Sequence, residues 1–262
     1  MSDILEVNNL TMDFGGLRAL DNVNIRVAPK KTVALIGPNG AGKTTFFNCI
    51  TGIYAPTGGA LYLLSNDGNR HRINGLKPNK ITQLGMARTF QNIRLFNNMT
   101  AMENVMIGQH CRTSTGVWGA ILRDRKTITE ENNVVKNAYH LLEQVDLSKR
   151  ANMLAKHLPY GEQRRLEIAR ALATHPQLLL LDEPAAGMNP QETISLVSLI
   201  QKIQHIYHIS VLIIEHDMKL VMQLSDYIYV LDYGRLIASG TPEIIKKHPQ
   251  VIQAYLGEAI DA

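Results

Sequence analysis

Glycines, a lysine and threonines stand together early in the chain, in the run Gly37-Pro38-Asn39-Gly40-Ala41-Gly42-Lys43-Thr44-Thr45. This order fits the pattern G-x-x-x-x-G-K-[ST], in which glycine backbone lets successive N–H groups point at one anion. Lys43 can then reach the terminal phosphates of a nucleotide, and the Thr44 hydroxyl can bind a magnesium ion. The alternative is a plain glycine-rich turn, but every fixed position is filled, so the run predicts a site for a nucleoside triphosphate with Mg²⁺.

Two acids follow an apolar run later in the chain, Leu178-Leu179-Leu180-Leu181-Asp182-Glu183. The run predicts a buried strand, and open α/β sheets bind ligands beyond the carboxyl ends of their strands. Asp182 can then hold Mg²⁺, directly or through water, and Glu183 can polarise an attacking water. The alternative is two solvated acids at a strand end.

Gln91 and His216 each follow another predicted strand, over residues 86–90 and 210–214. Each is a weak signal alone, because most glutamines are surface residues and most lone histidines are structural. Their order relative to the phosphate loop, residues 37–45, and to Asp182 and Glu183 gives them weight.

Apolar periodicity predicts the elements that must position these residues. The first third is expected to be a β-rich layer around one strand–loop–helix unit, and residues 97–175 are expected to be helical. Capping boxes are predicted to begin helices at Thr100 and Thr127, with a loop over 113–119 between them. After residue 175, the chain is expected to return to alternating strands and helices. Strands are expected over 4–14, 20–27, 32–36, 60–64, 86–90, 177–181, 210–214, 227–231 and 236–239, and helices over 46–50, 78–84, 162–174, 218–224 and 250–256, with others starting at Pro190 and Pro242.

The composition describes a globular protein of 262 residues, 45% apolar and 19% charged. No apolar run approaches the roughly 18 residues that span a bilayer, and the start, Met1-Ser2-Asp3, does not resemble a secretory signal. The two cysteines form no framework of pairs, and Cys49 is expected in the core, so we expect a cytosolic setting. The net charge of +4 comes from scattered basic residues, which predicts no nucleic-acid partner.

Taken in order, these motifs closely resemble the nucleotide-binding subunit of ABC transporters. The resemblance covers essentially the whole chain. It assigns Phe14 as the aromatic that stacks on adenine, residues 37–45 as the phosphate loop, Gln91 as the Q-loop glutamine, Leu158-Pro159-Tyr160-Gly161-Glu162-Gln163 as the signature segment, residues 178–183 as the acidic strand, Ala186-Gly187-Met188-Asn189 as the D-loop and His216 as the switch histidine.

The resemblance implies an α/β fold with a P-loop NTPase (RecA-like) core, an N-terminal antiparallel β layer and an inserted α-helical subdomain. Residues 1–262 would form a single ABC ATPase domain, with 1–96 and 176–262 as the nucleotide-binding core and 97–175 as the helical subdomain. The cofactors would be ATP and Mg²⁺. Thr44, Gln91 and Asp182 would serve the metal, and Glu183, His216 and Gln91 would serve hydrolysis.

The same resemblance implies a peripheral protein on the cytoplasmic face of the cell's inner membrane. Its partners would be a second ATPase subunit, expected to be a different chain, two membrane permease subunits and, indirectly, a substrate-binding protein. Each ATP would lie between the phosphate loop of one subunit and the signature segment of the other. We expect the turn Arg94-Leu95-Phe96 to be exposed and to line the permease docking groove.

Within the family, the chain looks most like the ATPases of branched-chain amino-acid importers. The runs Thr89-Phe90-Gln91-Asn92-Ile93-Arg94-Leu95-Phe96, Glu215-His216-Asp217-Met218 and Ala254-Tyr255-Leu256-Gly257-Glu258 carry this narrower likeness. Importers of urea or short-chain amides have close relatives of this subunit and form the alternative. A soluble ABC ATPase acting on ribosomes or DNA, a small-molecule kinase and a purely structural nucleotide binder explain fewer of the motifs.

Three residues depart from the family pattern. Pro159 stands where a serine usually contacts the partner's γ-phosphate, and it supplies neither a hydroxyl nor an N–H. Glu162 places a negative charge where a glutamine is usual, close to a triphosphate. Asn189 replaces the usual D-loop aspartate. These differences leave open how strongly the signature segment of this chain contacts the ATP held by the partner subunit.

Overall fold

The computed structural model describes residues 2–65, 67–109 and 125–258, without the side chains of 125–131 and 256–258. A six-stranded sheet with the order β10-β9-β3-β8-β7-β6 forms its centre. The neighbours from β9 to β6 pair in parallel, and β10 pairs antiparallel with β9 as a hairpin. These strands are β3 (Thr32–Ile36), β6 (Met86–Arg88), β7 (Leu178–Asp182), β8 (Ser210–Ile214), β9 (Tyr227–Asp232) and β10 (Arg235–Gly240).

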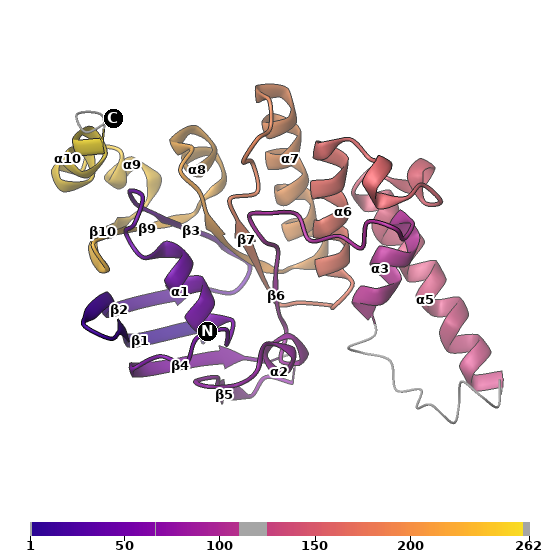
Figure 1. The fold of residues 1–262 in the computed structure, drawn as a ribbon, viewed down its shortest axis with the longest axis horizontal. Coiled ribbons are helices and arrows are strands. Elements are labelled where there is room, and N and C mark those ends of the chain that lie inside the picture. Colours follow the sequence, from indigo (N-terminus) through magenta and orange to yellow (C-terminus); the bar gives the residue numbers. More distant parts are fainter. Residues whose placement is uncertain (1, 66, 110–124, 259–262) are drawn as a thin grey trace.

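A second, antiparallel sheet has the order β2-β1-β4-β5 and lies at the lower left of Figure 1. In its first three strands, buried side chains alternate for much of the length with less buried ones, as expected for a sheet with one covered face. The short strand β5 was not predicted, because its three residues are polar and it only extends the edge of β4. The strands are β1 (Leu5–Phe14), β2 (Leu17–Val27), β4 (Gly58–Leu64) and β5 (Arg70–Arg72).

Helices cover both faces of the central sheet (Figure 1). On one side, α1 (Lys43–Ile50) is packed between the two sheets. The other side carries α6 (Tyr160–Leu172), α7 (Pro190–Tyr207) and α8 (Met218–Leu224), with α3 (Ala101–Gln109) and α5 (Arg125–Gln144) beyond α6. The remaining pieces are α2 (Pro78–Gln83), α9 (Pro242–Ile245), α10 (Pro249–Glu258) and two 3₁₀ turns, η1 (Ser148–Arg150) and η2 (Ala155–His157).

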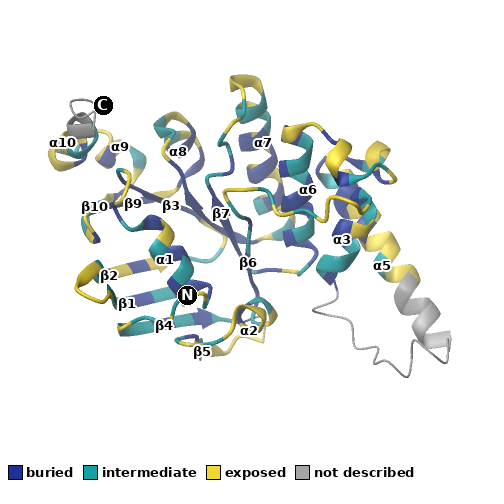
Figure 2. Ribbon diagram, viewed as in Figure 1, coloured by how far each residue is buried: buried dark blue, intermediate teal, exposed yellow. Residues whose placement is uncertain are grey.

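The core divides into two clusters because successive side chains of a strand point to opposite faces. Leu178 and Leu180 pack with α1 and the antiparallel sheet, whereas Leu179 and Leu181 pack with α6, α7 and α8. The strands β3, β7 and β8 are buried along their whole length (Figure 2). Cys49 lies in the first cluster as predicted, and burial raises the pKa of its thiol to about 11.

Some boundaries differ from those predicted. The capping box at Thr100 is present, with reciprocal hydrogen bonds to Glu103, but α5 begins at Arg125, so Thr127 lies inside a helix. Helix α6 begins two residues earlier than expected, at Tyr160. The predicted loop over 113–119 lies outside the described residues. No helix in the described ranges is both long and apolar enough to cross a bilayer.

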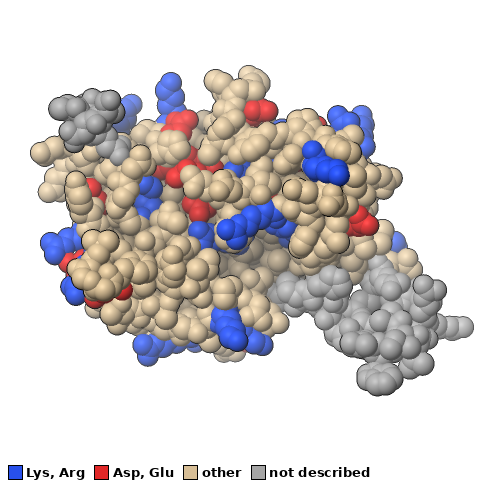
Figure 3. Space-filling view, viewed as in Figure 1, with Lys and Arg blue, Asp and Glu red and all other residues tan. Residues whose placement is uncertain are grey.

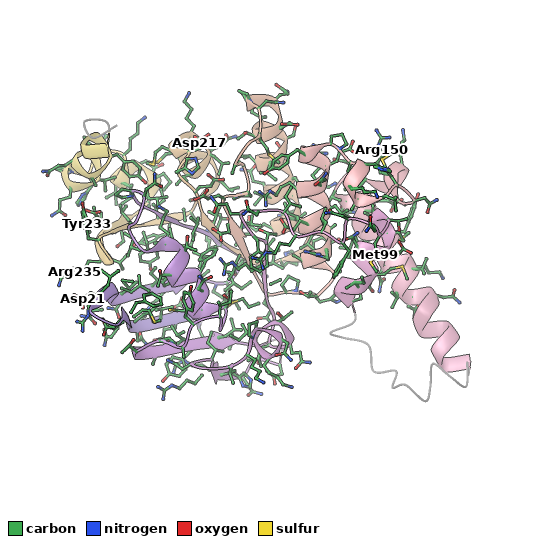
Figure 4. All side chains as sticks on the ribbon, viewed as in Figure 1. Asp21, Met99, Arg150, Asp217, Tyr233 and Arg235 are labelled. Carbon is green, nitrogen blue, oxygen red and sulfur yellow. The ribbon has the colours of Figure 1, made fainter. Side chains whose placement is uncertain are left out.

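Charged side chains lie in small groups over the face drawn in Figure 3, with acidic and basic residues interspersed. One such group at the left edge joins Arg235 of β10 to Asp21 of β2, with 2.8 Å between Nε and Oδ2 (Figure 4). This contact ties the two sheets together near the phosphate loop, since Gly234 N also donates to Ala41 O.

Candidate functional site

The phosphate loop connects β3 to α1 and depends on its glycines. Gly37, Gly40 and Gly42 have φ values of +153°, +78° and +103°, in the region that favours glycine. A Cβ on Gly37 would lie 1.9 Å from the carbonyl oxygen of Leu231, whereas a Cβ on Gly40 would meet nothing within 4 Å. The loop is thus closely packed at its start and open at Gly40.

The loop fits a polyphosphate. The space beside Gly40 is where a side chain would otherwise stand, and the first N–H groups of α1 open towards the loop. The ammonium of Lys43 is buried within the loop and donates to the carbonyl oxygens of Gly37, at 2.6 Å, and Pro38, at 2.8 Å. A cation held there can exchange these carbonyls for phosphate oxygens.

The oxygen donors of Thr44 and Asp182 suit a magnesium ion, which prefers hard oxygen ligands completed by phosphate and water. Thr44 is exposed on the first turn of α1. Asp182 is buried at the end of β7. Asp182 and the phosphate loop lie at the same end of the sheet, because Ile214 of β8 pairs with Leu35 of β3 on one side and with Asp182 on the other, and Thr44 follows β3 on α1.

Three predicted catalytic residues come together beyond the end of β7. The side-chain amide of Gln91 donates to the Glu183 carboxylate at 2.6 Å, and His216 Nδ1 lies 3.8 Å from the same oxygen. Glu183 has a φ of +44°, a strained conformation for a residue with a side chain, and its N–H donates to Ile214 O at 2.9 Å. Strain of this kind is typical of functional sites. The trio can orient a water and accept its proton.

Asp182 has a partner that was not predicted. Arg88, the last residue of β6, donates from Nη2 to Asp182 Oδ2 at 2.7 Å. A carboxylate has about four lone-pair sites, so Asp182 can hold both Arg88 and a metal or its water. The sequence alone gave no signal for this pair, since 94 positions separate the two residues.

Phe14 ends β1 and is 40% exposed, as a stacking aromatic requires. The ring of Tyr54 meets it edge-on, with 5.3 Å between ring centroids. Tyr54 was not predicted as part of the site, and it fixes the orientation of the Phe14 ring.

The signature segment, residues 158–163, forms the start of α6. Leu158 is buried, Pro159 is the N-cap without a side-chain cap, and Tyr160 is exposed. The hydroxyl of Tyr160 donates to Ala186 O at 2.9 Å, so the signature segment contacts the D-loop segment, residues 186–189. A Cβ on Gly161 would lie 3.0 Å from Glu192 Oε1 on α7, which leaves little room for any other residue.

Two of the departures from the family pattern have structural partners. Glu162 lies 3.5 Å from Nε of Arg150, labelled in Figure 4, so a neighbouring cation offsets its charge. Asn189 is the N-cap of α7. Its side chain accepts from Glu192 N at 3.0 Å, and the Glu192 carboxylate accepts from Asn189 N at 3.0 Å. Both asparagine and aspartate serve well at such a position.

A buried ion pair fastens the loop that carries Gln91 to α6. Arg164, fully buried, donates to Glu167 at 2.9 Å, to Phe90 O at 2.6 Å and to Gln91 O at 2.7 Å. Glu167 also accepts from the backbone N–H groups of Phe90 and Arg94. Sequence reasoning missed this pair; its only local signal is an arginine and a glutamate three positions apart on an apolar helix face.

The turn predicted to dock a permease is only partly exposed. Arg94 is exposed and lies over the Phe90 ring, 4.2 Å from its centroid, and Phe96 is 47% exposed. Leu95 is half-buried against the core, so its predicted exposure was wrong: its apolar side chain packs inward. Beside Phe96 lies a groove of about 300 Å³, named the docking groove below. Its lining includes Arg88, Phe96, Gly108, Glu167 and Arg170.

Glu215, just before His216, is a further buried acid that was not predicted. Its two carboxylate oxygens accept from Ala185 N at 3.0 Å and from His216 N at 3.2 Å. Burial raises the pKa of this carboxyl, and the backbone donors partly oppose that shift. Glu215 thereby joins the segment after β7 to the segment that carries His216.

Comparison with known protein families and with individual proteins shows what this chain is similar to. The model described as "ABC transporter" matches residues 20–186, and the one described as "Branched-chain amino acid ATP-binding cassette transporter" matches residues 235–261. The chain is 52% identical to the high-affinity branched-chain amino acid transport ATP-binding protein BraF of Pseudomonas aeruginosa, over 98% of each chain. It is 48% identical to the corresponding LivG protein of Escherichia coli K12, again over 98% of each.

Solved structures with the same fold superpose on the chain. The ADP conformation of MJ1267, an ATP-binding cassette of an ABC transporter, is 30% identical to the chain and superposes with a TM-score of 0.82, covering 98% of this chain and 100% of that one. A dimeric post-hydrolysis state of the cassette MJ0796, bound to ADP and Pi, is 25% identical with a TM-score of 0.72, covering 91% and 98%. The predicted fold class is therefore confirmed.

Proposed function

The chain belongs to the ABC transporter family, among the branched-chain amino acid ATP-binding proteins, and we propose that it hydrolyses ATP to power uptake of branched-chain amino acids through permease partners. The contact of Glu183 with Gln91 and His216, at the sheet edge that also carries the phosphate loop, is the observation that supports hydrolysis most directly. The identity to branched-chain relatives does not favour the urea and amide alternative.

We propose these roles for the residues at the phosphate end of the site. Lys43 exchanges its bonds to the loop carbonyls for bonds to the β- and γ-phosphates, and the loop amides hold the remaining oxygens. Thr44 and Asp182 hold Mg²⁺, which when bound neutralises the charge that develops on the phosphates. Phe14, backed by Tyr54, stacks on the adenine.

Glu183 is proposed as the residue that orients the attacking water and accepts its proton. It is half-buried, which limits competing water, and Gln91 fixes one of its oxygens. His216 is exposed and lies close to Glu183. It is proposed to contact the γ-phosphate next to the same water. Gln91, also proposed near the metal, lies on a loop that Arg164 fastens to α6, so a displacement of α6 would move it.

A second ATPase subunit, expected to be a different chain, would complete each site. The N-terminus of α6 offers Tyr160, Gly161 and unpaired N–H groups to phosphate on that partner, because Pro159 caps the helix without covering them. Asn189, at the start of α7, would face the same partner. We extend the proposal to residues 97–175 as a helical subdomain that carries this signature segment.

Permease subunits are proposed to dock in the docking groove. The groove combines an exposed aromatic, Phe96, with the cation Arg170, whose CZ atom lies 5.6 Å from the centroid of the Phe96 ring. A clustered aromatic and arginine are typical anchors of protein interfaces. With membrane permeases as partners, the chain would lie on the cytoplasmic face of the membrane, and a substrate-binding protein would deliver the amino acid from the other side.

The function can be tested by co-expressing the chain with the products of its neighbouring genes, purifying them together and reconstituting them in lipid vesicles. The expected result is ATP-dependent uptake of radiolabelled leucine, with hydrolysis stimulated by the permease and the receptor. Uptake of urea in place of leucine would select the alternative substrate. Recovery with ribosomes instead of permeases would contradict transport and favour a soluble ABC ATPase.

A further inference from the structure

Arg88 makes contacts that neither its strand nor the proposed site requires. It ends β6, and its side chain is only 8% exposed. Besides Asp182, it donates from Nη1 to Asn48 Oδ1 at 2.8 Å and to Thr51 Oγ1 at 3.2 Å. Asn48 lies on α1 and Thr51 is its C-cap, so one guanidinium joins the end of β7 to the helix that carries the phosphate loop.

The guanidinium also contacts the loop that carries Gln91. Its CZ atom lies 5.1 Å from the centroid of the Phe90 ring and 5.3 Å from that of Phe47 on α1. Phe90 immediately precedes Gln91, which contacts Glu183. Arg88 is therefore packed against the three segments that hold the phosphate loop, the acids and the glutamine.

One side of this buried arginine faces the docking groove. Arg88 is among the residues that line the groove, together with Phe96 and Arg170. Within the described residues, its Nε–H is buried and has no hydrogen-bond partner. Buried donors are almost always paired, and this unpaired donor belongs to a residue that lines the groove, so a molecule bound there can complete it once the guanidinium shifts.

We propose that Arg88 is the positioning residue through which the docking groove acts on Asp182. With the groove empty, its guanidinium pairs with Asp182, and its positive charge weakens the hold of that carboxylate on Mg²⁺. An acceptor from a permease segment in the groove, bonded to Nε–H, shifts the guanidinium and so changes Asp182 and α1 together. This inference rests on the proposed docking of a permease in that groove.

The first measurement uses the isolated full chain and does not depend on turnover. Binding of a non-hydrolysable ATP analogue is followed while magnesium is titrated. Arg88→Gln removes a cation that lies 2.7 Å from Asp182 Oδ2, so the magnesium concentration for half-maximal binding should fall on the order of tenfold. Affinity for the analogue without magnesium should stay within about twofold, because the phosphate loop is unchanged.

The variant Arg88→Lys separates the effect of the positive charge from the effect of the guanidinium's shape. Lysine keeps the cation but lacks the planar fork that reaches Asp182 and Asn48 at once. The magnesium requirement of this variant should stay near that of the unchanged chain, while stimulation of hydrolysis by the permease should be lost in both variants. A merely structural arginine would instead lower the melting temperature of both and leave the magnesium requirement unmoved. Arg72→Gln, an exposed change on β5, is the matched control.

Permease association, measured by co-purification, should persist in both Arg88 variants. An unchanged magnesium requirement in Arg88→Gln overturns the effect of the Arg88 charge at Asp182, and full stimulation in that variant overturns the coupling. If the unchanged chain itself fails to bind a permease, the docking function fails and the coupling with it. The magnesium titration of the isolated chain would still decide whether Arg88 controls Asp182.

Discussion

The amide of Gln91 donates a 2.6 Å hydrogen bond to the carboxylate of Glu183, across 92 positions of sequence. Gln91 lies on a loop fastened to α6 by Arg164, whereas Glu183 follows β7 in the central sheet. The distance between the two residues therefore depends on how α6 sits against the sheet. The Glu183 carboxylate is therefore in position for catalysis only when the loop that carries Gln91 is in a suitable arrangement.

Glu183→Gln should bind ATP with nearly unchanged affinity and hydrolyse it about 10² to 10⁴ times more slowly, because a positioned base is lost while Asp182 remains. The new amide can still accept from Gln91, so the local structure is expected to persist. Single-turnover hydrolysis, with nucleotide binding measured in parallel, checks this. Undiminished single-turnover hydrolysis would assign the base to another residue.

Phe96→Ala should abolish permease association or permease-stimulated hydrolysis and leave ATP binding intact. Phe96 is exposed at the docking groove and its ring lies beside Arg170 in the same groove, so its removal alters the groove and not the phosphate loop. Co-purification and stimulated ATPase rates are the measurements. Met99→Ala, an exposed apolar residue further along the same segment (Figure 4), is the control that should keep both. Unchanged coupling in Phe96→Ala would contradict docking at this groove.

Sequence alone predicted the parts of this site whose chemistry is local. The phosphate loop depends on glycines and a lysine within nine positions, and the strand before Asp182 is a continuous apolar run. Gln91 and His216 could be assigned only through their order among the other motifs. Their shared contact with Glu183 is a tertiary result.

The residues that escaped prediction are those whose partners are distant in sequence. Arg88 pairs with Asp182, and Arg164 holds the loop of Gln91 from 73 positions away. Arginines are usually exposed, so composition and periodicity gave no reason to place either one inside. The exposure expected for Leu95 failed for a related reason, since only the fold decides which side of a turn meets the core.

Arg164→Met should lower the free energy of unfolding by about 3–5 kcal/mol, because it leaves the buried Glu167 carboxylate without its cation. The neighbouring change Arg165→Met is a close control. Arg165 pairs with the exposed Asp146 at 3.5 Å, and such surface pairs are worth about 0–1 kcal/mol. Urea denaturation of both variants tests the difference. Equal losses in the two would show that the buried pair adds nothing.

Glu215 predicts a pH dependence of stability. Burial raises the pKa of its carboxyl above the ordinary value of 4.5, so between that value and the raised one the folded chain binds more protons than the unfolded chain. The contribution of Glu215 to the free energy of unfolding should therefore fall as pH rises through this window, by up to about 1.4 kcal/mol per pH unit. Glu215→Gln should remove this slope in denaturation curves taken from pH 4.5 upwards. The exposed change Glu143→Gln should leave it, and a slope that survives Glu215→Gln would assign it to another group.

Asn189 allows its capping role to be separated from the contact expected across the ATPase dimer. Asn189→Ala removes the acceptor for Glu192 N and should lower the free energy of unfolding by about 1 kcal/mol, whereas Asn189→Asp should keep the cap. Denaturation of the single chain measures this role alone. If Asn189 also serves the partner's site, Asn189→Asp, stable as a monomer, should still change the ATPase rate of the assembled complex. An unaltered rate would limit Asn189 to the start of α7, and stability equal to the unchanged chain in Asn189→Ala would contradict the cap itself.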